Sequence, residues 1–156
     1  MTEKKVSESK TEMSQLMMPQ HANFGGTVYG GTIISIADSV AYVCAARHAG
    51  PNCVTVSVNR VDFHEQVRIG ELVTFLASVN FVGRSSMEIG IKIFSENLET
   101  GKKWHTNSCY FTMVCLNDQR RPKEVPRLVP ETADEKRRYE EGRKRHEAAR
   151  ALFKKQ

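Results

Sequence analysis

The sequence predicts an α+β fold in which a curved antiparallel sheet wraps a long central helix, and a second helix forms the C-terminal end. Two patterns lead to this expectation. Residues 32–46 form one apolar, alanine-rich stretch, whose length favours a helix buried on all sides. From residue 53 onward, apolar and polar residues alternate in segments separated by short turns, as in antiparallel strands. A helix this apolar needs a sheet around it.

The chain has 156 residues, which suit one domain with one core. We expect a disordered leader in residues 1–15, a folded domain in residues 16–130 and a helical extension in residues 131–156. The leader alternates charges and serines and lacks the apolar segment of a secretory signal, which predicts a cytoplasmic protein. No apolar run reaches the roughly 18 residues of a membrane span, so no membrane-spanning segment is expected.

The composition excludes several classes of site. Hydrophobic residues make up 40% and charged residues 26% of the chain, as in an ordinary globular protein. The four cysteines show no CxxC spacing and the five histidines no metal-ligand spacing, so neither disulfides nor a metal site are expected. The net charge of +5 would attract anions such as nucleotides, although a solvated surface of mixed charge explains it at least as well.

The elements before the sheet follow from local signals. Residues 17–29 are rich in Gly, Asn and Pro and predict an irregular loop. The loop ends at Gly30 and Gly31, directly before the long helix. After that helix a half-buried strand begins at Cys53, with one face formed by the alternate valines at positions 54, 56 and 58.

The next segments predict a hairpin and a third antiparallel neighbour. Residues 72–82 are rich in β-forming residues and meet a turn at Gly83 and Arg84, after which apolar residues recur at 87, 89, 91 and 93. A second turn at residues 99–102 leads into a strand over residues 104–116.

The C-terminal extension carries its own start signal. Thr132 and Glu135 form a capping box, and residues 134–155 are strongly helix-forming. The apolar stripe of this segment is thin, and it consists of Tyr139, His146, Leu152 and Phe153. We therefore expect a helix that projects from the domain with a charged, solvated face.

Asp38 is the strongest single indication of chemistry. An ionisable side chain in the middle of an apolar helix is costly unless it is paired or functional. Asp38 is therefore a candidate catalytic group. From the helical context alone, an aspartate with a structural hydrogen bond at a subunit interface is an equally good interpretation.

The residues before the helix could hold a developing negative charge. Unpaired N–H groups at Gly30 and Gly31, together with the helix dipole, can stabilise an oxyanion, although a Gly-Gly pair more commonly makes a tight turn. The segment is no phosphate-binding loop, because the Lys-Ser/Thr that would follow is missing. Asn23 could orient a water molecule or donate to a carbonyl oxygen, but loop asparagines more often satisfy turns.

Helix geometry limits how these groups cooperate. Asp38 lies seven residues beyond Gly31, hence on the same face but about 10 Å further along the axis. Asp38 is thus too far to act on a carbonyl held at the start of its own helix. If both act together, Asp38 of one subunit must meet Gly31 and Asn23 of another, which requires a dimer with its central helices side by side. No serine-hydrolase, zincin or dinucleotide motif occurs.

Three separate motifs in the same order carry a resemblance to a known family. HANFGGTVYGGTIISIADSVAYVCAARH, TVSVNRVDFHEQVRIGELV and VGRSSMEI closely resemble the acyl-CoA thioesterases of the hot-dog fold. The resemblance extends from about Leu16 to Arg145. It includes the segment LVPETADEKRRYEEGRKR, which looks like that of thioesterases active on medium and long acyl chains.

The resemblance implies roles for particular residues. Asn23 and Asp38 match the catalytic asparagine and aspartate, which different subunits of a hot-dog dimer contribute. Gly30 and Gly31 match the site of the thioester carbonyl. The turn ending in Arg84, Ser85 and Ser86 matches a substrate-binding segment near coenzyme A, where Arg84 could meet a phosphate. Many relatives have His in place of Tyr29, so this side chain has no assigned role.

The resemblance further implies hydrolysis of acyl-CoA to a fatty acid and coenzyme A without metal or organic cofactor, by a homo-oligomer built as a trimer of dimers. Asp38 would be a general base on water or, as the less favoured alternative, a nucleophile that forms an anhydride. Three rival functions remain: a non-catalytic module that senses acyl-CoA or a nucleotide, a hot-dog dehydratase using His21, and a nucleic-acid binder acting through the C-terminal helix. We expect no nucleic acid partner.

Overall fold

A computed structural model describes residues 2–155. The elements follow one another as β1 (Glu3–Lys5), the short 3-10 helix η1 (Val6–Glu8), β2 (Thr11–Leu16), the 3-10 helix η2 (Pro19–His21), α1 (Gly30–Ala49), β3 (Cys53–Asn59), β4 (Leu72–Val82), β5 (Ser86–Glu96), β6 (Lys103–Cys115), β7 (Arg127–Val129) and α2 (Ala133–Phe153). No helix in this range is long and apolar enough to cross a membrane.

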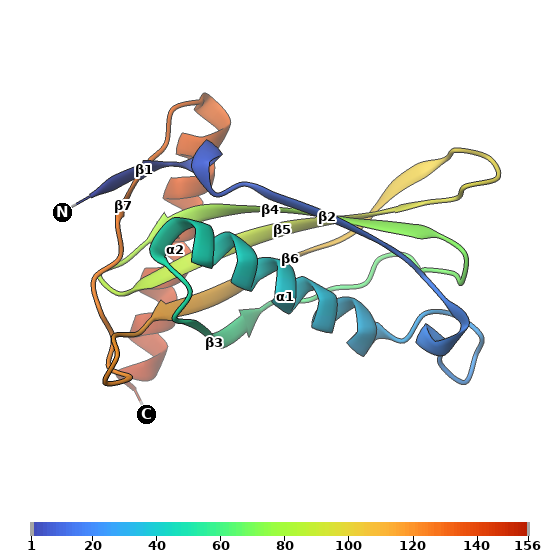
Figure 1. Cartoon of the computed structure of the whole chain (residues 1–156), viewed down its shortest axis with the longest axis horizontal. Helices are drawn as coiled ribbons and strands as arrows, with labels where there is room; N and C mark the ends of the chain where they lie inside the picture. The colour runs from blue at the N-terminus through green and yellow to red at the C-terminus, as the bar shows by residue number, and fades with distance from the viewer. Residues whose placement is uncertain (1, 156) are drawn as a thin grey trace.

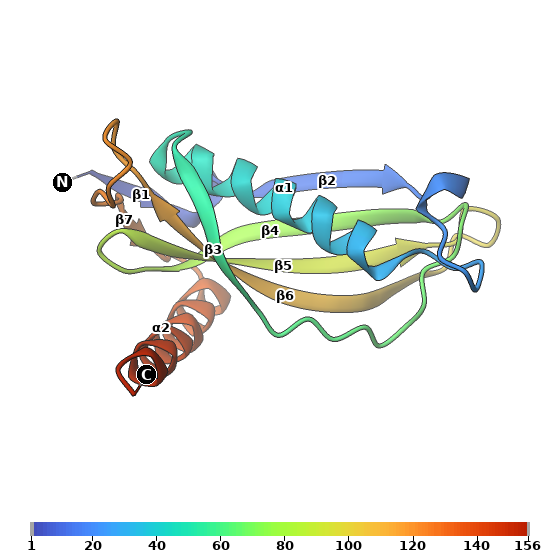
Figure 2. The same cartoon turned by 90° about the horizontal axis from the view of Figure 1, so that it is seen from below.

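Five strands form one sheet in the order β2-β4-β5-β6-β3, and every neighbouring pair is antiparallel. The long helix α1 lies across one face of this sheet, as Figures 1 and 2 show from two sides. The strands β1 and β7 pair in parallel as a separate small sheet. The predicted α+β layout, with a long helix against an antiparallel sheet, is confirmed, and so is the hairpin of β4 and β5 with β6 beside it.

The core lies between α1 and the sheet. Each of the three long strands turns every second side chain toward the helix, so that Phe75, Ile91 and Phe111 are buried. On α1, Val40, Ala41 and Cys44 recur at helical spacing and have no exposed surface.

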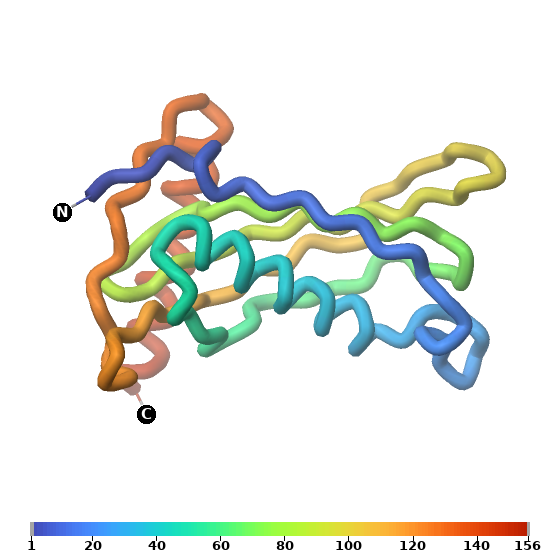
Figure 3. Tube along the Cα trace, viewed as in Figure 1, coloured from blue at the N-terminus to red at the C-terminus, as the bar shows by residue number. Residues whose placement is uncertain are grey.

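The prediction of a disordered leader was wrong. Residues 3–16 contain β1, η1 and β2, and β2 pairs with β4 along its whole length, from Thr11 beside Ala77 to Leu16 beside Leu72. Figure 3 shows this segment running along the edge of the sheet. Its stability comes from backbone hydrogen bonds to β4 and from the buried Val6, and a search for apolar periodicity does not detect such a polar edge strand.

The expectation of a helix buried on all sides was also wrong for the single chain. The sheet covers one side of α1 only, and Ser35, Ser39 and Tyr42 are exposed on the other side. The neighbouring β3 is an edge strand. Its bulge between Thr55 and Ser57 puts Val58 beside the buried Phe111 and Val54 beside Val114 on the outer face, so the predicted single face of valines is wrong. Along this edge the valines at positions 54, 56 and 58 are 39%, 55% and 41% exposed. We call this surface the α1–β3 face. Apolar residues on an uncovered strand edge are typical of a surface that another chain covers.

The C-terminal helix packs against the domain, which corrects the expectation of a projecting helix. The capping box is confirmed, because Glu135 N donates to Thr132 Oγ1 at 3.1 Å and Thr132 N to Glu135 Oε2 at 3.1 Å. Figure 2 shows α2 on the side of the sheet opposite α1. Tyr139 and His146 pack on Phe81 of β4, with ring centroids 5.1 and 5.3 Å away. Only the end of the predicted stripe, Leu152 and Phe153, is exposed.

Candidate functional site

The carboxylate of Asp38 is held in place by a threonine from the neighbouring strand. Asp38 is half-buried on α1, and Thr55 Oγ1 on β3 donates a hydrogen bond of 2.6 Å to its Oδ1. The strand is bulged between Thr55 and Ser57, and a bulge re-aims the side chains beside it. Among residues 2–155, Oδ2 accepts no hydrogen bond. One oxygen is therefore fixed, and the other has no hydrogen-bond partner in the described part of the chain.

Thr55 is the functional candidate that the sequence interpretation missed. Strand alternation alone placed its side chain on the face away from the valines, but nothing in the local pattern linked it to Asp38, which lies 17 residues earlier. The signal that could have found it is a hydroxyl on the strand that follows a helix with a buried carboxylate.

The side chain of Asn23 is fixed by its own loop. Its Oδ1 accepts hydrogen bonds from Gly25 N at 2.9 Å and Thr27 N at 3.2 Å, and its Nδ2 donates to Thr27 Oγ1 at 3.0 Å. The side chain of Asn23 thus stabilises the turn by hydrogen bonds to the backbone, as expected of a loop asparagine. An amide nitrogen carries two hydrogens, so one donor remains for a further partner on the exposed side of the loop.

The first turn of α1 leaves backbone donors open. Tyr29 precedes the helix and provides no side-chain cap, and the N–H groups of Gly30 and Gly31 have no acceptor among residues 2–155. A Cβ on Gly31 would overlap the ring of Tyr29, while a Cβ on Gly30 would touch the ring of Phe63 at 3.5 Å. Two free donors at the positive end of a helix dipole can hold an oxyanion.

One chain does not bring all the predicted residues together. Asp38 is about 10 Å along the helix axis from Gly31. The turn with Arg84, Ser85 and Ser86 leads from β4 into β5, at the end of the molecule opposite the loop that precedes α1 (Figure 1). There the exposed Arg84 pairs with Glu124, with Nε and Oε1 3.5 Å apart. The carbonyls of Ser85 and Ser86 accept hydrogen bonds from Cys115 N and Gly83 N.

The cysteines do not offer a nucleophile. All four are free and buried. Burial raises the pKa of the Cys44 thiol to about 11 and the pKa of the Cys53 and Cys109 thiols to about 12, so the reactive thiolate is scarce near neutral pH. Within residues 2–155 no three His, Cys, Asp or Glu side chains come together as a metal site would need.

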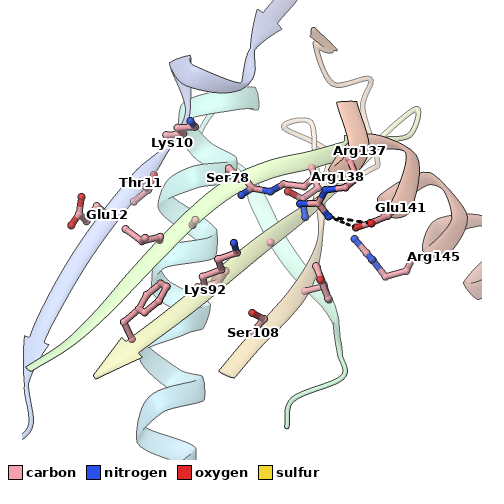
Figure 4. A pocket seen from close by; sticks show the side chains of 17 residues that line it. Lys10, Thr11, Glu12, Ser78, Lys92, Ser108, Arg137, Arg138, Glu141 and Arg145 are labelled. Carbon is pink, nitrogen blue, oxygen red and sulfur yellow. Dashed lines mark hydrogen bonds and ion pairs between the residues drawn. The ribbon is translucent and has the colours of Figure 1, made fainter. Parts of the chain in front are cut away.

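A groove of about 560 Å³ lies on the outer face of the sheet beside α2, and none of the predicted residues lines it. Figure 4 shows that its polar side chains come from the sheet on one side and from α2 on the other. Most of its cations are already paired. Arg137 contacts Asp134 and Glu141, and Arg138 contacts Asp134. Because no predicted site residue lines it, the groove is separate from the site around Asp38.

Comparison with known proteins gives one consistent picture. The profile of the thioesterase superfamily matches residues 25–102. The protein VdlD of Helicobacter pylori is 45% identical over 91% of this chain and 81% of its own length. A mouse protein named cytosolic acyl coenzyme A thioester hydrolase is 38% identical over 90% of this chain and 38% of its own length.

Solved structures agree with this result. An acyl-CoA hydrolase of Staphylococcus aureus, solved with butyryl coenzyme A and coenzyme A, has a TM-score of 0.90 at 34% identity over 97% of this chain and 93% of that chain. A structure described as an apo-hexameric acyl-CoA thioesterase has a TM-score of 0.93 at 33% identity over 98% of both chains. The S. aureus enzyme has also been solved with an aspartate, an asparagine and a threonine each replaced by alanine.

Proposed function

This chain belongs to the thioesterase superfamily, and from that premise we propose that it hydrolyses acyl-CoA to a carboxylic acid and coenzyme A at the site around Asp38. The observation that carries this proposal is the hydrogen bond from Thr55 to Asp38. In the S. aureus hydrolase, the replaced asparagine and aspartate are 15 positions apart, and the aspartate and threonine are 17 apart. The same intervals separate Asn23, Asp38 and Thr55 here.

The site is composite. Because Asp38 is about 10 Å from the start of its own helix, the Asp38 of one protomer serves a thioester held at Asn23, Gly30 and Gly31 of another. The uncovered α1–β3 face supports this assembly, since Asp38 and the exposed edge of β3 with Val58 lie on it. The pairing of two such faces puts two helices side by side and gives two equal sites per dimer.

Two of these relatives also support a proposal for the oligomeric state and the cellular location of the protein. The hexameric structure that this chain resembles supports a homo-oligomer of three such dimers. The name of the mouse relative supports a cytoplasmic enzyme.

The chemistry proceeds through attack by water. The free oxygen of Asp38 takes a proton from a water molecule, whose oxygen bonds to the thioester carbon. The carbonyl oxygen becomes an oxyanion, which the N–H groups of Gly30 and Gly31 stabilise. When the oxyanion collapses, the carbon–sulfur bond breaks, and the proton on Asp38 passes to the sulfur of coenzyme A. Asn23 positions the water or the carbonyl with its remaining amide hydrogen.

The alternative for Asp38 is a nucleophile that attacks the thioester carbon and forms an anhydride. Water that opens the anhydride at the Asp38 carbon leaves its oxygen in that carboxylate, an outcome that direct attack on the thioester cannot give. In a single turnover in ¹⁸O-labelled water, appearance of the label in the Asp38 carboxylate identifies the anhydride route, whereas water attack on the thioester leaves this carboxylate unlabelled.

The turn between β4 and β5 contributes to coenzyme A binding. Arg84 is exposed and its single pairing with Glu124 is long, at 3.5 Å, so a phosphate can compete for its guanidinium. The hydroxyls of Ser85 and Ser86 have no hydrogen-bond partner among residues 2–155, so they are available to the same ligand.

The direct test is release of free thiol from acyl-CoAs of increasing chain length by the wild type and by Asp38→Ala. Removal of a general base typically costs 10²–10⁴ in rate, so we expect a loss of about a hundredfold or more in kcat. Binding of acyl-CoA without turnover by the wild type would instead identify the chain as a non-catalytic sensing module. Full activity of Asp38→Ala would remove Asp38 from the mechanism.

A further inference from the structure

A buried polar side chain, Asn107, stands at the start of the row of side chains that β6 turns toward α1. The row continues with Cys109, Phe111, Met113 and Cys115, all of them in the core. Asn107 opens the row and is 1% exposed, and its Nδ2 has no hydrogen-bond partner among residues 2–155. A buried amide N–H without a partner destabilises a fold, so the position needs an explanation other than packing.

The oxygen of the amide lies against the hydroxyl of Thr106. Thr106 Oγ1 lies 3.1 Å from Asn107 Oδ1 and 3.1 Å from the carbonyl of Ile93. The register between β5 and β6 shifts at this point, between Ile93 and Phe94, so that Thr106 and Asn107 are both buried. Bulges of this kind aim side chains near active sites. The single hydrogen of the Thr106 hydroxyl serves one of these two oxygens at a time, and Asn107 Nδ2 has no acceptor among residues 2–155.

A short path of contacts connects Asn107 with the first turn of α1. His64 N donates to the carbonyl of Thr106 at 3.2 Å. The residue before it, Phe63, places its ring against Gly30, 3.5 Å from where a Cβ would be. Figure 2 shows the start of β6 and the start of α1 at the same end of the molecule. Asn107 therefore belongs to the end of the core that lies beneath the glycine pair.

Strand geometry separates Asn107 from Asp38 of its own chain. Met113 is the register partner of Thr55, which holds Asp38. Asn107 lies six residues before Met113, about 20 Å along the strand. In a composite site, Asn107 is accordingly on the side that holds the substrate, together with Gly30 of the same chain.

We propose that Asn107 Nδ2 donates a hydrogen bond to the carbonyl oxygen of the bound thioester, from the sheet side, while Gly30 and Gly31 donate from the helix side. This inference rests on the proposed function and adds a substrate-positioning residue to it. A carbonyl oxygen has two lone pairs and accepts from both directions. The bond to Asn107 strengthens as the oxygen becomes an oxyanion, which is the reason to retain an otherwise unpaired amide.

Binding to an inactive enzyme isolates the carbonyl contact. In an Asp38→Asn background, we would measure Kd for decanoyl-CoA and for S-decyl-CoA, a thioether without the carbonyl oxygen. Adding Asn107→Leu is expected to weaken decanoyl-CoA binding by about 3- to 10-fold, the value of one neutral hydrogen bond, and to leave S-decyl-CoA binding unchanged. An equal loss for both ligands, or a loss for neither, overturns the proposal.

Kinetics and stability give a second, independent readout. With Asp38 intact, Asn107→Leu is expected to lower kcat by about 10²-fold, as for one donor to an oxyanion. Because leucine removes the unpaired N–H at similar size, Tm should stay the same or rise. Unchanged kcat with a raised Tm would mean that Asn107 is only an unsatisfied core residue, and would refute its role. If Asn107→Leu does not fold, Asn107→Ser serves in the same pair of binding measurements.

A matched control is Asn80. This asparagine is also buried, but it lies on the outer face of the sheet, and its Nδ2 donates to Glu88 Oε1 at 3.3 Å. Asn80→Leu should lower Tm and leave the preference for decanoyl-CoA over S-decyl-CoA unchanged. A loss of that preference in Asn80→Leu would show that any disturbed core produces it, and would count against Asn107. Failure of the wild type to release thiol would refute the proposed function, while the binding comparison would still decide the role of Asn107.

Discussion

Arg145 of α2 donates two hydrogen bonds to the buried carboxylate of Glu88 on β5, from Nε to Oε2 at 2.9 Å and from Nη2 to Oε1 at 2.7 Å. The guanidinium also lies 3.9 Å from the ring centroid of Tyr110. This clamp joins residues 57 positions apart and fixes the C-terminal helix on the outer face of the sheet, opposite α1 (Figure 2).

Removal of Arg145 should destabilise the fold strongly. Arg145→Leu leaves the buried carboxylate of Glu88 without a cation and with only the hydrogen bond from Asn80, and loss of one partner of a buried ion pair typically costs about 3–5 kcal/mol. We expect a clearly lower Tm and denaturation midpoint at a fixed protein concentration. The matched control is Arg143→Leu, because Arg143 pairs with Glu140 and Glu147 on the surface of the same helix and such pairs contribute little. Equal losses of Tm in the two variants would show that the clamp contributes no more to stability than a surface ion pair.

Thr55 should matter for rate more than for stability. Thr55→Val keeps the shape of the side chain but removes the donor to Asp38 Oδ1, so the carboxylate loses its fixed orientation. We expect kcat for acyl-CoA hydrolysis to fall by about 10-fold, on the order of one charge-assisted hydrogen bond of 1.5–3 kcal/mol. Thr55→Ser keeps the hydroxyl and should retain most of the activity. If Thr55→Val hydrolyses acyl-CoA as fast as the wild type, the orientation of Asp38 does not depend on this bond.

Two inactive variants should complement each other if the site is shared between protomers. In a mixed dimer of Asn23→Ala and Asp38→Ala, one site carries both defects and the other carries neither. Random mixing in equal amounts makes half of the dimers mixed, so about one quarter of the wild-type activity should return. Subunit exchange would be verified by mass spectrometry of the native dimers. No recovery of activity despite complete exchange would rule out the composite site.

His48 should make the protein less stable in mild acid. The ring is fully buried, with Nε2 2.8 Å from the carbonyl of Pro126, and Nδ1 has no partner among residues 2–155. Burial lowers the pKa of His48 below its ordinary value of 6.5. The unfolded chain therefore binds a proton before the folded chain does. Stability from the neutral ring is complete above pH 6.5 and is lost as the pH falls toward the folded-state pKa.

The measurement for His48 is Tm between pH 8 and pH 5. The wild type should lose Tm below pH 6.5, and His48→Gln, which cannot titrate, should show a smaller loss over the same interval. Identical slopes for the two proteins would assign the acid sensitivity to other groups.

The local elements were readable from the sequence because their signals are local. The β-forming residues of positions 72–82 predicted β4, and the apolar run of residues 32–46 predicted α1, with bounds close to those in the structure. The glycine pair at the helix start was also predicted in place. The distance between Gly31 and Asp38 follows from helix geometry alone, so a site shared between two chains could be proposed from the sequence.

Other features depend on which segments meet in space. The sequence predicted neither the strand β2, which gains its stability from pairing with β4, nor the open side of α1, which depends on how far the sheet curls. Strand register and helix placement likewise decide three polar features: the bond between Thr55 and Asp38, the clamp between Arg145 and Glu88, and the unpaired amide of Asn107. Periodicity records which face of an element is apolar, but only the tertiary structure decides which polar group on another element lies opposite it.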